Sequence, residues 1–375
     1  MARYKFDQIA HYLNEKRMPT EADRETYIGL EHLDSGNLTV TRWGSDVDIK
    51  GQKLVMHKGD ILFGRRNTYL KRAAIAPHDG LFSAHGMIWR PKEDVVDASF
   101  FPFFVSSDYF MDEAIRISVG SLSPTINWRD LKELEFDLPD IDTQRKLSTL
   151  LWAMERAKTA YKNLIAKTDE LVKSQFVEMF GENKAGCRYL KLEYCCTKIT
   201  GGKTPSMSHP EFYGGDIPFI KSGDVKESTV SKGVLWLTEE AITKGGASLL
   251  PKDSIIVVIR SAALRHEFHV AVTEVPVVIN QDLKAFQPKP EFMPIYLQWA
   301  IMSHESSLLG KVQTVLTSHI EMSDLLSIPV MVADLEQQQA FCDFKQQADK
   351  SKFAAQQALA DLTATQKALM RQYLG

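Results

Sequence analysis

Cysteine is scarce in this sequence, and long apolar runs are missing. Four cysteines in 375 residues cannot form a disulfide framework, so we expect reduced thiols and a cytoplasmic protein. No apolar run approaches the roughly 20 residues that a membrane span needs. The first ten residues, MARYKFDQIA, lack the apolar core of a signal peptide. We therefore expect no membrane partner.

Motifs of several enzyme classes are also missing. Gly202-Lys203-Thr204 resembles the end of a phosphate-binding loop, Gly-x-x-x-x-Gly-Lys-Ser/Thr. That motif needs a second glycine five positions before Gly202, and Thr197 stands there instead. No asparagine begins an Asn-Pro-Pro-aromatic motif of the methyltransferase type. We therefore expect no catalytic residue and no cofactor on this chain.

The charge balance excludes a generally basic surface. Lys and Arg total 45 against 48 Asp and Glu, a net charge of −3. A local basic groove for nucleic acid remains open. The chain is 44% apolar and 25% charged, which is typical of globular proteins. Its length suggests about two domains, or one large one.

The strongest positive signal is an internal repeat. The segment that begins at Ile126 matches the one that begins at Ile320, and upstream Arg3-Tyr4 resembles Arg188-Tyr189. The aligned pairs include Asp130 with Asp324, Leu131 with Leu325 and Gln144 with Gln338. Two mixed domains can share a few apolar matches by chance. The agreement in order and spacing favours a duplication.

Each half begins with short β-branched runs bounded by turns, such as ILFG, SIIVVI and VPVVI. Shorter helices are predicted at Phe101 to Arg116 and at Pro294 to Leu309. Each half then ends in a long helix, from about Asp142 to Phe180 and from about Glu336 to Tyr373, without an interior proline or glycine.

Apolar and small residues recur along both long helices at the 3-4 spacing of a coiled-coil seam. The predicted seam consists of Leu147, Leu150, Met154, Tyr161, Leu164 and Leu171 in the first helix and of Phe341, Phe344, Ala348, Ala355, Leu362 and Leu369 in the second. A helix this long cannot bury its stripe in its own small domain. We expect the two helices to pack antiparallel; the alternative is that each folds back onto its own domain.

The sequence thus predicts an α+β chain with a pseudo-two-fold internal repeat. Two similar mixed α/β domains are joined by two long antiparallel coiled-coil helices. The predicted boundaries are 1–140 for the first domain, 141–182 for its helix, 183–333 for the second domain and 334–375 for its helix.

Several motifs of the second half resemble a known family. The segment ITGGKTPSMSHPEFYGGDIPFIKSGDV, from Ile199 to Val225, is similar to the start of a target recognition domain in the specificity (S) subunit of type I restriction-modification systems. Val278-Ile279-Asn280-Gln281 and Leu335-Glu336-Gln337-Gln338-Gln339 resemble later motifs of that family. The first half lacks the Gly-Gly-Thr-Pro opening and has Asp142-Thr143-Gln144-Arg145 at the helix entry.

The resemblance implies a function in phage defence. Each domain would read one half-site of a split double-stranded DNA target, and the helices would act as spacers that set the gap. They would also dock two methyltransferase (M) subunits, and restriction (R) subunits would join through them. S-adenosylmethionine, ATP and Mg would be held by those partner subunits. A methyltransferase-only or type IIB-like system fits the same motifs, and a scaffold that binds only proteins is the alternative of a different class.

DNA binding needs cations for phosphates and planar or amide groups for base edges. Two cation-rich segments each follow a predicted strand, and polar segments accompany them. The candidate DNA-binding residues are Arg65, Arg66, Asn67, Tyr69, Lys71, Arg72 and Ser123 in the first domain and Lys203, Thr204, Ser206, Lys221, Arg260, Arg265, His266 and His319 in the second. Solvated loop charges are the alternative interpretation.

No metal site is expected. Cys195 and Cys196 are adjacent, which does not fit the usual zinc spacing, and Cys187 and Cys342 lie far away in sequence. We expect all four thiols to be buried and inert. His266 and His269 are interpreted as loop residues.

Overall fold

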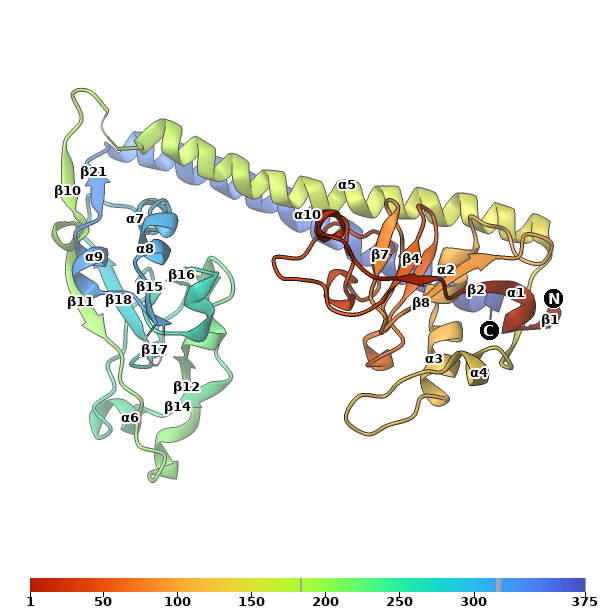
Figure 1. Cartoon of the computed structure of the whole chain (residues 1–375). Coiled ribbons are helices and arrows are strands. Elements are labelled where there is room, and N and C mark those ends of the chain that lie inside the picture. Colours follow the sequence, from red (N-terminus) through yellow and green to blue (C-terminus); the bar gives the residue numbers. More distant parts are fainter. Residues whose placement is uncertain (183, 315–317, 375) are drawn as a thin grey trace. The chain divides into compact units, whose positions relative to one another are not determined.

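The computed structural model describes residues 1–182, 184–314 and 318–374 (Figure 1). The chain forms two compact units. Unit 1 consists of Met1–Asn163 and Ala355–Gly375, and unit 2 consists of Leu164–Ala354. We call residues 1–140 head 1 and residues 184–334 head 2. Among the described residues, no helix combines the length and the apolarity that a membrane span requires.

Head 1 is built on a four-stranded antiparallel sheet whose central strands are buried on both faces. Its order is β2 (Ala10–Leu13), β8 (Met87–Pro91), β5 (Ile61–Phe63) and β6 (Ala73–Ile75). A smaller antiparallel sheet has the order β3 (Lys16–Arg17), β4 (Lys53–Met56) and β7 (Gly80–Phe82). The predicted ILFG strand is therefore β5.

Head 2 repeats this strand order in its larger sheet. That sheet has the order β11 (Cys196–Gly201), β18 (Leu283–Pro288), β15 (Ile255–Val258), β16 (Val270–Thr273) and β13 (Thr229–Val230). Its first four strands are antiparallel, as in head 1, and β13 adds a parallel edge. The smaller sheet has the order β14 (Leu235–Leu237), β12 (Tyr213–Ile220) and β17 (Val278–Ile279), and it contains a parallel pair that head 1 lacks among its described strands.

Both heads are closed by the same kind of strand pair. In head 1, β1 (Ala2–Lys5) pairs antiparallel with β9 (Glu135–Leu138), the strand that leads into the long helix. In head 2, β10 (Tyr189–Lys191) pairs in the same way with β21 (Pro329–Met331). The predicted duplication of two mixed α/β domains is therefore confirmed.

The predicted shorter helices are present, and each is split into a pair. Ser107 divides the first of them, because its Oγ accepts a 3.2 Å bond from the backbone N–H of Phe110 and so caps the following helix. The short helices of head 1 are α1 (Phe6–Ile9), α2 (Phe101–Ser106), α3 (Asp108–Arg116) and α4 (Trp128–Leu131). Those of head 2 are α6 (Glu239–Thr243), α7 (Pro294–Met302), α8 (Glu305–Gly310) and α9 (Met322–Leu326). The 3-10 turns outside the candidate site are η1 (Glu21–Glu25), η2 (Leu30–His32), η4 (Leu192–Cys195), η5 (Pro210–Phe212) and η6 (Ser222–Asp224).

The two long helices are α5 (Ile141–Phe180) and α10 (Leu335–Leu374), of 40 residues each. Both start after an aspartate that caps a free backbone N–H: Asp140 accepts from Thr143 at 2.9 Å, and Asp334 accepts from Gln337 at 2.8 Å. These caps place both starts one residue before the predicted ones.

The long helices pair antiparallel within each unit. In unit 1 the beginning of α5 lies beside the end of α10, and in unit 2 the end of α5 lies beside the beginning of α10 (Figure 1). Their inner faces also join the core of the adjoining head. In unit 2, Phe176 meets Phe341 edge to face at 5.0 Å and Tyr296 of head 2 at 5.8 Å. Helix pairing is confirmed, and the helices contact the heads as well.

The buried stripe of α5 differs from the predicted seam. At every second position the buried residue lies one residue after the predicted one. Leu150, Leu164 and Leu171 are 45%, 48% and 54% exposed, so their assignment to the seam was wrong. The stripe that the structure buries or half-buries is Leu147, Leu151, Met154, Lys158, Tyr161, Ile165, Thr168 and Val172. The residues predicted for α10 are all buried or half-buried: Phe341, Phe344, Ala348, Ala355, Leu362 and Leu369.

A lysine occupies one of the displaced seam positions. Lys158 is only 8% exposed, and its Nζ donates a 2.6 Å bond to Oε1 of Gln366 on α10. The same Nζ lies 2.5 Å from Oε1 of Glu155, which also accepts from Nε2 of Gln366 at 2.9 Å. Because the charged end meets two oxygen acceptors, one of them a carboxylate, the aliphatic stem of Lys158 can occupy an apolar seam. A pattern of apolar residues alone does not reveal such a position.

In each half, a buried glutamine near the start of the long helix forms the same set of hydrogen bonds with the head. Gln144 and Gln338 are completely buried. Oε1 of Gln144 accepts from the backbone N–H of Asp97 at 2.8 Å, and Oε1 of Gln338 accepts from that of Met293 at 2.8 Å. Each Nε2 donates to two backbone carbonyls, those of Val95 and Pro139 for Gln144 and those of Glu291 and Ala333 for Gln338.

We expect Gln338→Leu to lower the free energy of unfolding of unit 2 by about 2–4 kcal/mol, because a buried N–H and two carbonyls would lose their partner. Urea-induced unfolding followed by circular dichroism would measure the change. The control is Gln337→Leu on the adjacent, exposed position, for which we expect a change within about 0.5 kcal/mol. Equal effects of the two substitutions would contradict this account.

Candidate nucleic-acid interface

The arginine loop of head 1, residues 64–72, follows the buried strand β5. It is closed by a 2.9 Å bond from the backbone N–H of Gly64 to the carbonyl of Arg72. Its tip is the 3-10 turn η3 (Thr68–Leu70), flanked by Asn67 and Lys71 at φ values of 54° and 45°. Two non-glycine residues in the left-handed region store strain, which is concentrated at functional sites in proteins.

A hairpin of residues 119–125 is fastened to this loop. Two backbone bonds between Val119 and Thr125 close the hairpin. Thr125 forms a β-bridge with Arg66, and the carbonyl of Pro124 accepts from the N–H of Asn67 at 2.8 Å. The predicted candidates Arg66, Asn67 and Ser123 are thus brought together, although more than 50 residues separate them in sequence.

Head 2 builds the same junction after the equivalent strand β15. Arg260 forms a β-bridge with His319, and the N–H of Ser261 donates to the carbonyl of Ser318 at 3.2 Å. The strands β19 (Gln313–Thr314) and β20 (Ser318–His319) pair antiparallel at the matching place. Arg265, in the turn η7 (Ala262–Arg265), donates from Nε to Oγ of Ser318 at 3.4 Å, and His266 follows it.

One backbone bond shows that the two junctions are equivalent. The N–H of Ile126 donates to the carbonyl of Arg65 at 3.0 Å in head 1, and the N–H of Ile320 donates to that of Ile259 at 2.9 Å in head 2. Arg66 and Arg260, each one residue further along, therefore occupy the same position. Both side chains are exposed, and neither forms a hydrogen bond or an ion pair within the described part of the chain.

Lys71 and Arg72 of the arginine loop are bonded to other parts of head 1 and support the loop. Nζ of Lys71 lies 2.9 Å from Oδ1 of Asp108 and 2.7 Å from Oδ1 of Asp112. Burial lowers the pKa of Lys71, but the hydrogen bonds and negative charges of these two carboxylates together raise it above its usual value. Arg72 donates to the carbonyls of Leu30 at 2.9 Å and Arg66 at 3.1 Å, and burial lowers its pKa. Both are less free to meet a phosphate than Arg66, while Tyr69 is 59% exposed at the tip.

Three polar motifs of head 2 meet at one edge of its smaller sheet, because β12 and β17 are parallel and end together. The N–H of Asn280 donates to the carbonyl of Ile220, next to Lys221, at 3.1 Å. The N–H of Lys203 donates to the carbonyl of Ile279 at 3.0 Å. The Oγ1 of Thr204 donates to Oε1 of Gln281 at 2.6 Å.

The glycine before Lys203 is required at this edge. A Cβ on Gly202 would lie 2.0 Å from the carbonyl oxygen of Asn280, so no larger residue fits. Ser206 lies further along the same loop, and its Oγ shares a 2.7 Å hydrogen bond with Oγ of Ser208. The edge thus presents a lysine, a threonine and amide groups. The hydrogen bond between Thr204 and Gln281 could not be predicted from the sequence motifs.

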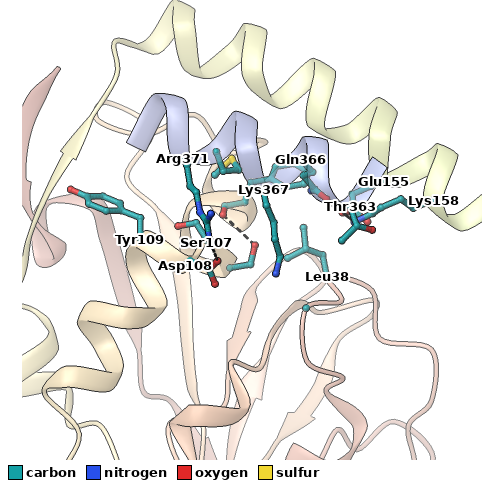
Figure 2. A pocket seen from close by; sticks show the side chains of 14 residues that line it. Leu38, Ser107, Asp108, Tyr109, Glu155, Lys158, Thr363, Gln366, Lys367 and Arg371 are labelled. Carbon is teal, nitrogen blue, oxygen red and sulfur yellow. Dashed lines mark hydrogen bonds and ion pairs between the residues drawn. The ribbon is translucent and has the colours of Figure 1, made fainter. Parts of the chain in front are cut away.

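A cavity of about 130 Å³ lies in unit 1 where α2 and α3 face the two long helices (Figure 2). Lys367 and Arg371 extend into it from α10, beside Ser107 and Asp108. Arg371 lies 3.7 Å from Asp108, and Lys158 is paired with Glu155. Because much of the charge on its wall is compensated, the cavity has the character of a structural junction.

The described cysteines and histidines form no shared metal site. Among residues 1–182, 184–314 and 318–374, no three His, Cys, Asp or Glu side chains are arranged to hold a metal ion. Cys195, Cys196 and Cys342 are buried, whereas Cys187 is exposed, so the prediction that all four thiols are buried was wrong for Cys187. It lies in the connection between α5 and β10, outside the packed core.

The geometry defines a duplicated mixed α/β fold with one arginine-bearing junction in each half, and known proteins share this fold. Residues 194–361, which include most of head 2 and much of α10, match the family described as type I restriction modification DNA specificity domain. The predicted resemblance to specificity subunits is therefore confirmed, and the matched segment is similar to a domain of this kind.

Curated relatives carry the same description. The chain is 32% identical over 145 residues to the EcoR124I/EcoR124II type I restriction enzyme specificity subunit of Escherichia coli, which is 38% of this chain and 36% of that protein. It is 30% identical over 105 residues to the MjaIX specificity subunit of Methanocaldococcus jannaschii, 27% of this chain and 23% of that protein. The chain therefore spans well under half of these relatives in alignment.

Two solved structures share the fold over nearly the whole chain. One comes from work on complex assembly and conformational transition of the type I R-M system, with a TM-score of 0.63 at 17% identity, covering 99% of this chain and 97% of that one. The other is the type I restriction-modification S subunit from M. genitalium, with a TM-score of 0.58 at 12% identity, covering 100% and 96%. At these identities the likeness establishes the fold.

We expect one fast-reacting thiol in the native protein. Burial raises the pKa of Cys195 and Cys342 to about 11 and, as the largest effect, that of Cys196 to about 12. At pH 8 a thiol with such a pKa is about one-thousandth thiolate or less, and thiolate is the reactive form. Ellman's reagent should label Cys187 rapidly and the other three only after unfolding. Rapid labelling of a Cys187→Ser variant would contradict this.

Proposed function

We propose that this chain is the DNA sequence-recognition subunit of a type I restriction-modification complex in the cytoplasm, with residues 1–140 and 183–333 each reading one half-site of a bipartite target. The supporting observation is the equivalence of Arg66 and Arg260. Both are exposed, unpaired within the described residues, and held on a loop that is bridged to the segment before the closing strand. Such loops supply phosphate and base-edge contacts in the manner of DNA-binding proteins.

The proposed function includes a spacer role for the long helices and binding of the catalytic partner subunits. Residues 141–182 and 334–375 would separate the half-sites and dock two methyltransferase (M) subunits, through which restriction (R) subunits join. S-adenosylmethionine, ATP and Mg would be bound by those subunits, and this chain would carry no catalytic residue. A methyltransferase-only or type IIB-like assembly would use the same chain in the same way.

A protein-binding scaffold is the competing function, and charge reversal separates the two. We expect Arg66→Glu with Arg260→Glu to weaken DNA binding by the assembled complex roughly 10- to 100-fold and to reduce the salt dependence of log affinity by about 2, because two phosphate-facing cations are lost. Fluorescence anisotropy at several salt concentrations measures both quantities.

The control for this pair is Lys58→Glu with Lys252→Glu. These lysines are exposed and precede β5 and β15, at the opposite ends of the strands from Arg66 and Arg260. We expect their reversal to change affinity only slightly. If the two double variants bind DNA equally well, the arginine loops do not contact DNA.

The spacer function predicts a change in target geometry. We expect that inserting seven helix-forming residues after Asn163 in α5 and seven after Ala354 in α10 lengthens both helices by about 10 Å, or about three base pairs of DNA. Both insertions keep the seam in phase. Methylation mapping of a host with and without the gene would reveal the native bipartite motif. The same mapping with the insertion should show unchanged half-sites and a longer gap; an unchanged gap would reject the spacer role.

A further inference from the structure

The hairpin fastened to the arginine loop of head 1 carries an apolar side chain at its tip. Leu122 is 95% exposed, more than any other large apolar residue in the described part of the chain. It lies between Ser121 and Ser123, and Gly120 makes the turn at a φ of 106°. A single exposed leucine is ordinary on a protein surface, so its significance depends on where the hairpin holds it.

The hairpin is held rigidly in register with the cations. Val119 and Thr125 exchange backbone bonds of 3.1 and 2.9 Å, and the Oγ1 of Thr125 donates to the carbonyl of Ser123 at 2.9 Å. Pro124, two residues after Leu122, accepts from Asn67 of the arginine loop. A ligand held by Arg66 therefore lies within reach of the tip of the hairpin.

The surrounding charge suits a polyanion. Residues 117–127 contain no acidic side chain, and the bridged loop contributes the exposed, unpaired Arg66. An apolar tip flanked by hydroxyls and cations, without a carboxylate, fits the edge of a DNA groove between phosphates. DNA-bending proteins that bind the minor groove insert leucine and similar apolar side chains between stacked bases and so unstack them.

We propose that Leu122 is a wedge that inserts at a base step of the half-site read by head 1, partly unstacks it and bends the duplex. This rests on the proposed function, because the ligand is double-stranded DNA. Arg66 would hold the phosphate beside the opened step. The half-site would then be selected in part by how easily that step deforms, at a position without a hydrogen bond to a base edge.

The experiment uses the assembled complex and a target duplex, identified by methylation mapping, that carries 2-aminopurine at successive half-site positions and a dye pair at its ends. With the unaltered chain, we expect increased 2-aminopurine fluorescence at one step and a shorter end-to-end distance. Leu122→Ser should abolish both signals and weaken binding roughly tenfold, whereas Leu122→Met should retain them. Val47→Ser, at a 71% exposed position elsewhere in head 1, is the matched control and should leave them unchanged.

Each outcome has one interpretation. Equal fluorescence and bending with Leu122→Ser, or no unstacking with the unaltered chain bound, would overturn the wedge and leave DNA recognition intact. Loss of complex assembly in Leu122→Ser, with unchanged bending in the complex that remains, would overturn it in favour of a protein contact. A complex that does not bind its target at all would refute the proposed function itself.

Discussion

The junction between each head and its long helix depends on one buried amide. Gln144 and Gln338 each satisfy one backbone N–H and two carbonyls in places where water is excluded. Three backbone groups from the head and the helix entry are therefore bonded to one side chain, and the geometry of a planar amide fixes their mutual positions. The strand pair that closes each head ends directly before this junction. The loop, the hairpin and the sheets of a head consequently share one rigid support.

Much of this architecture could be predicted because the sequence contains an internal repeat. The repeat, the long helices and the matching positions after β5 and β15 emerge from aligned blocks, and the backbone bonds of Ile126 and Ile320 confirm the alignment near the candidate site. At the amino-terminal end the alignment of Arg3-Tyr4 with Arg188-Tyr189 was wrong by one residue. Phe6 and Leu192 are the true equivalents, since their N–H groups donate to the carbonyls of Leu134 and Ile328. A gap in short strands leaves too few apolar positions to fix such a register.

The seam errors and the partnered positions of two loop cations have a common physical origin. Sequence patterns assign lysine and arginine to the surface, but the location of their partners decides what they do. Lys158 lies in the seam because Glu155 and Gln366 meet its ammonium group. Lys71 and Arg72 support the arginine loop through carboxylates and carbonyls that are distant in sequence. A net charge near zero is therefore compatible with DNA binding, because a few unpaired cations at fixed places suffice for contact.

The polar contacts along the seam have diverged between the two halves. In unit 1, Lys158 meets the amide of Gln366 across the seam and the carboxylate of Glu155 on its own helix. Its repeat equivalent in unit 2, Lys352, meets the carboxylate of Asp169 across the seam at 2.7 Å. The residue that corresponds to Asp169 in the other half is Thr363, which has no charge. A chain assembled from two copies of the second half would set Lys352 against a hydroxyl and lose that ion pair. This ion pair across the seam is therefore specific to the pairing of one half with the other.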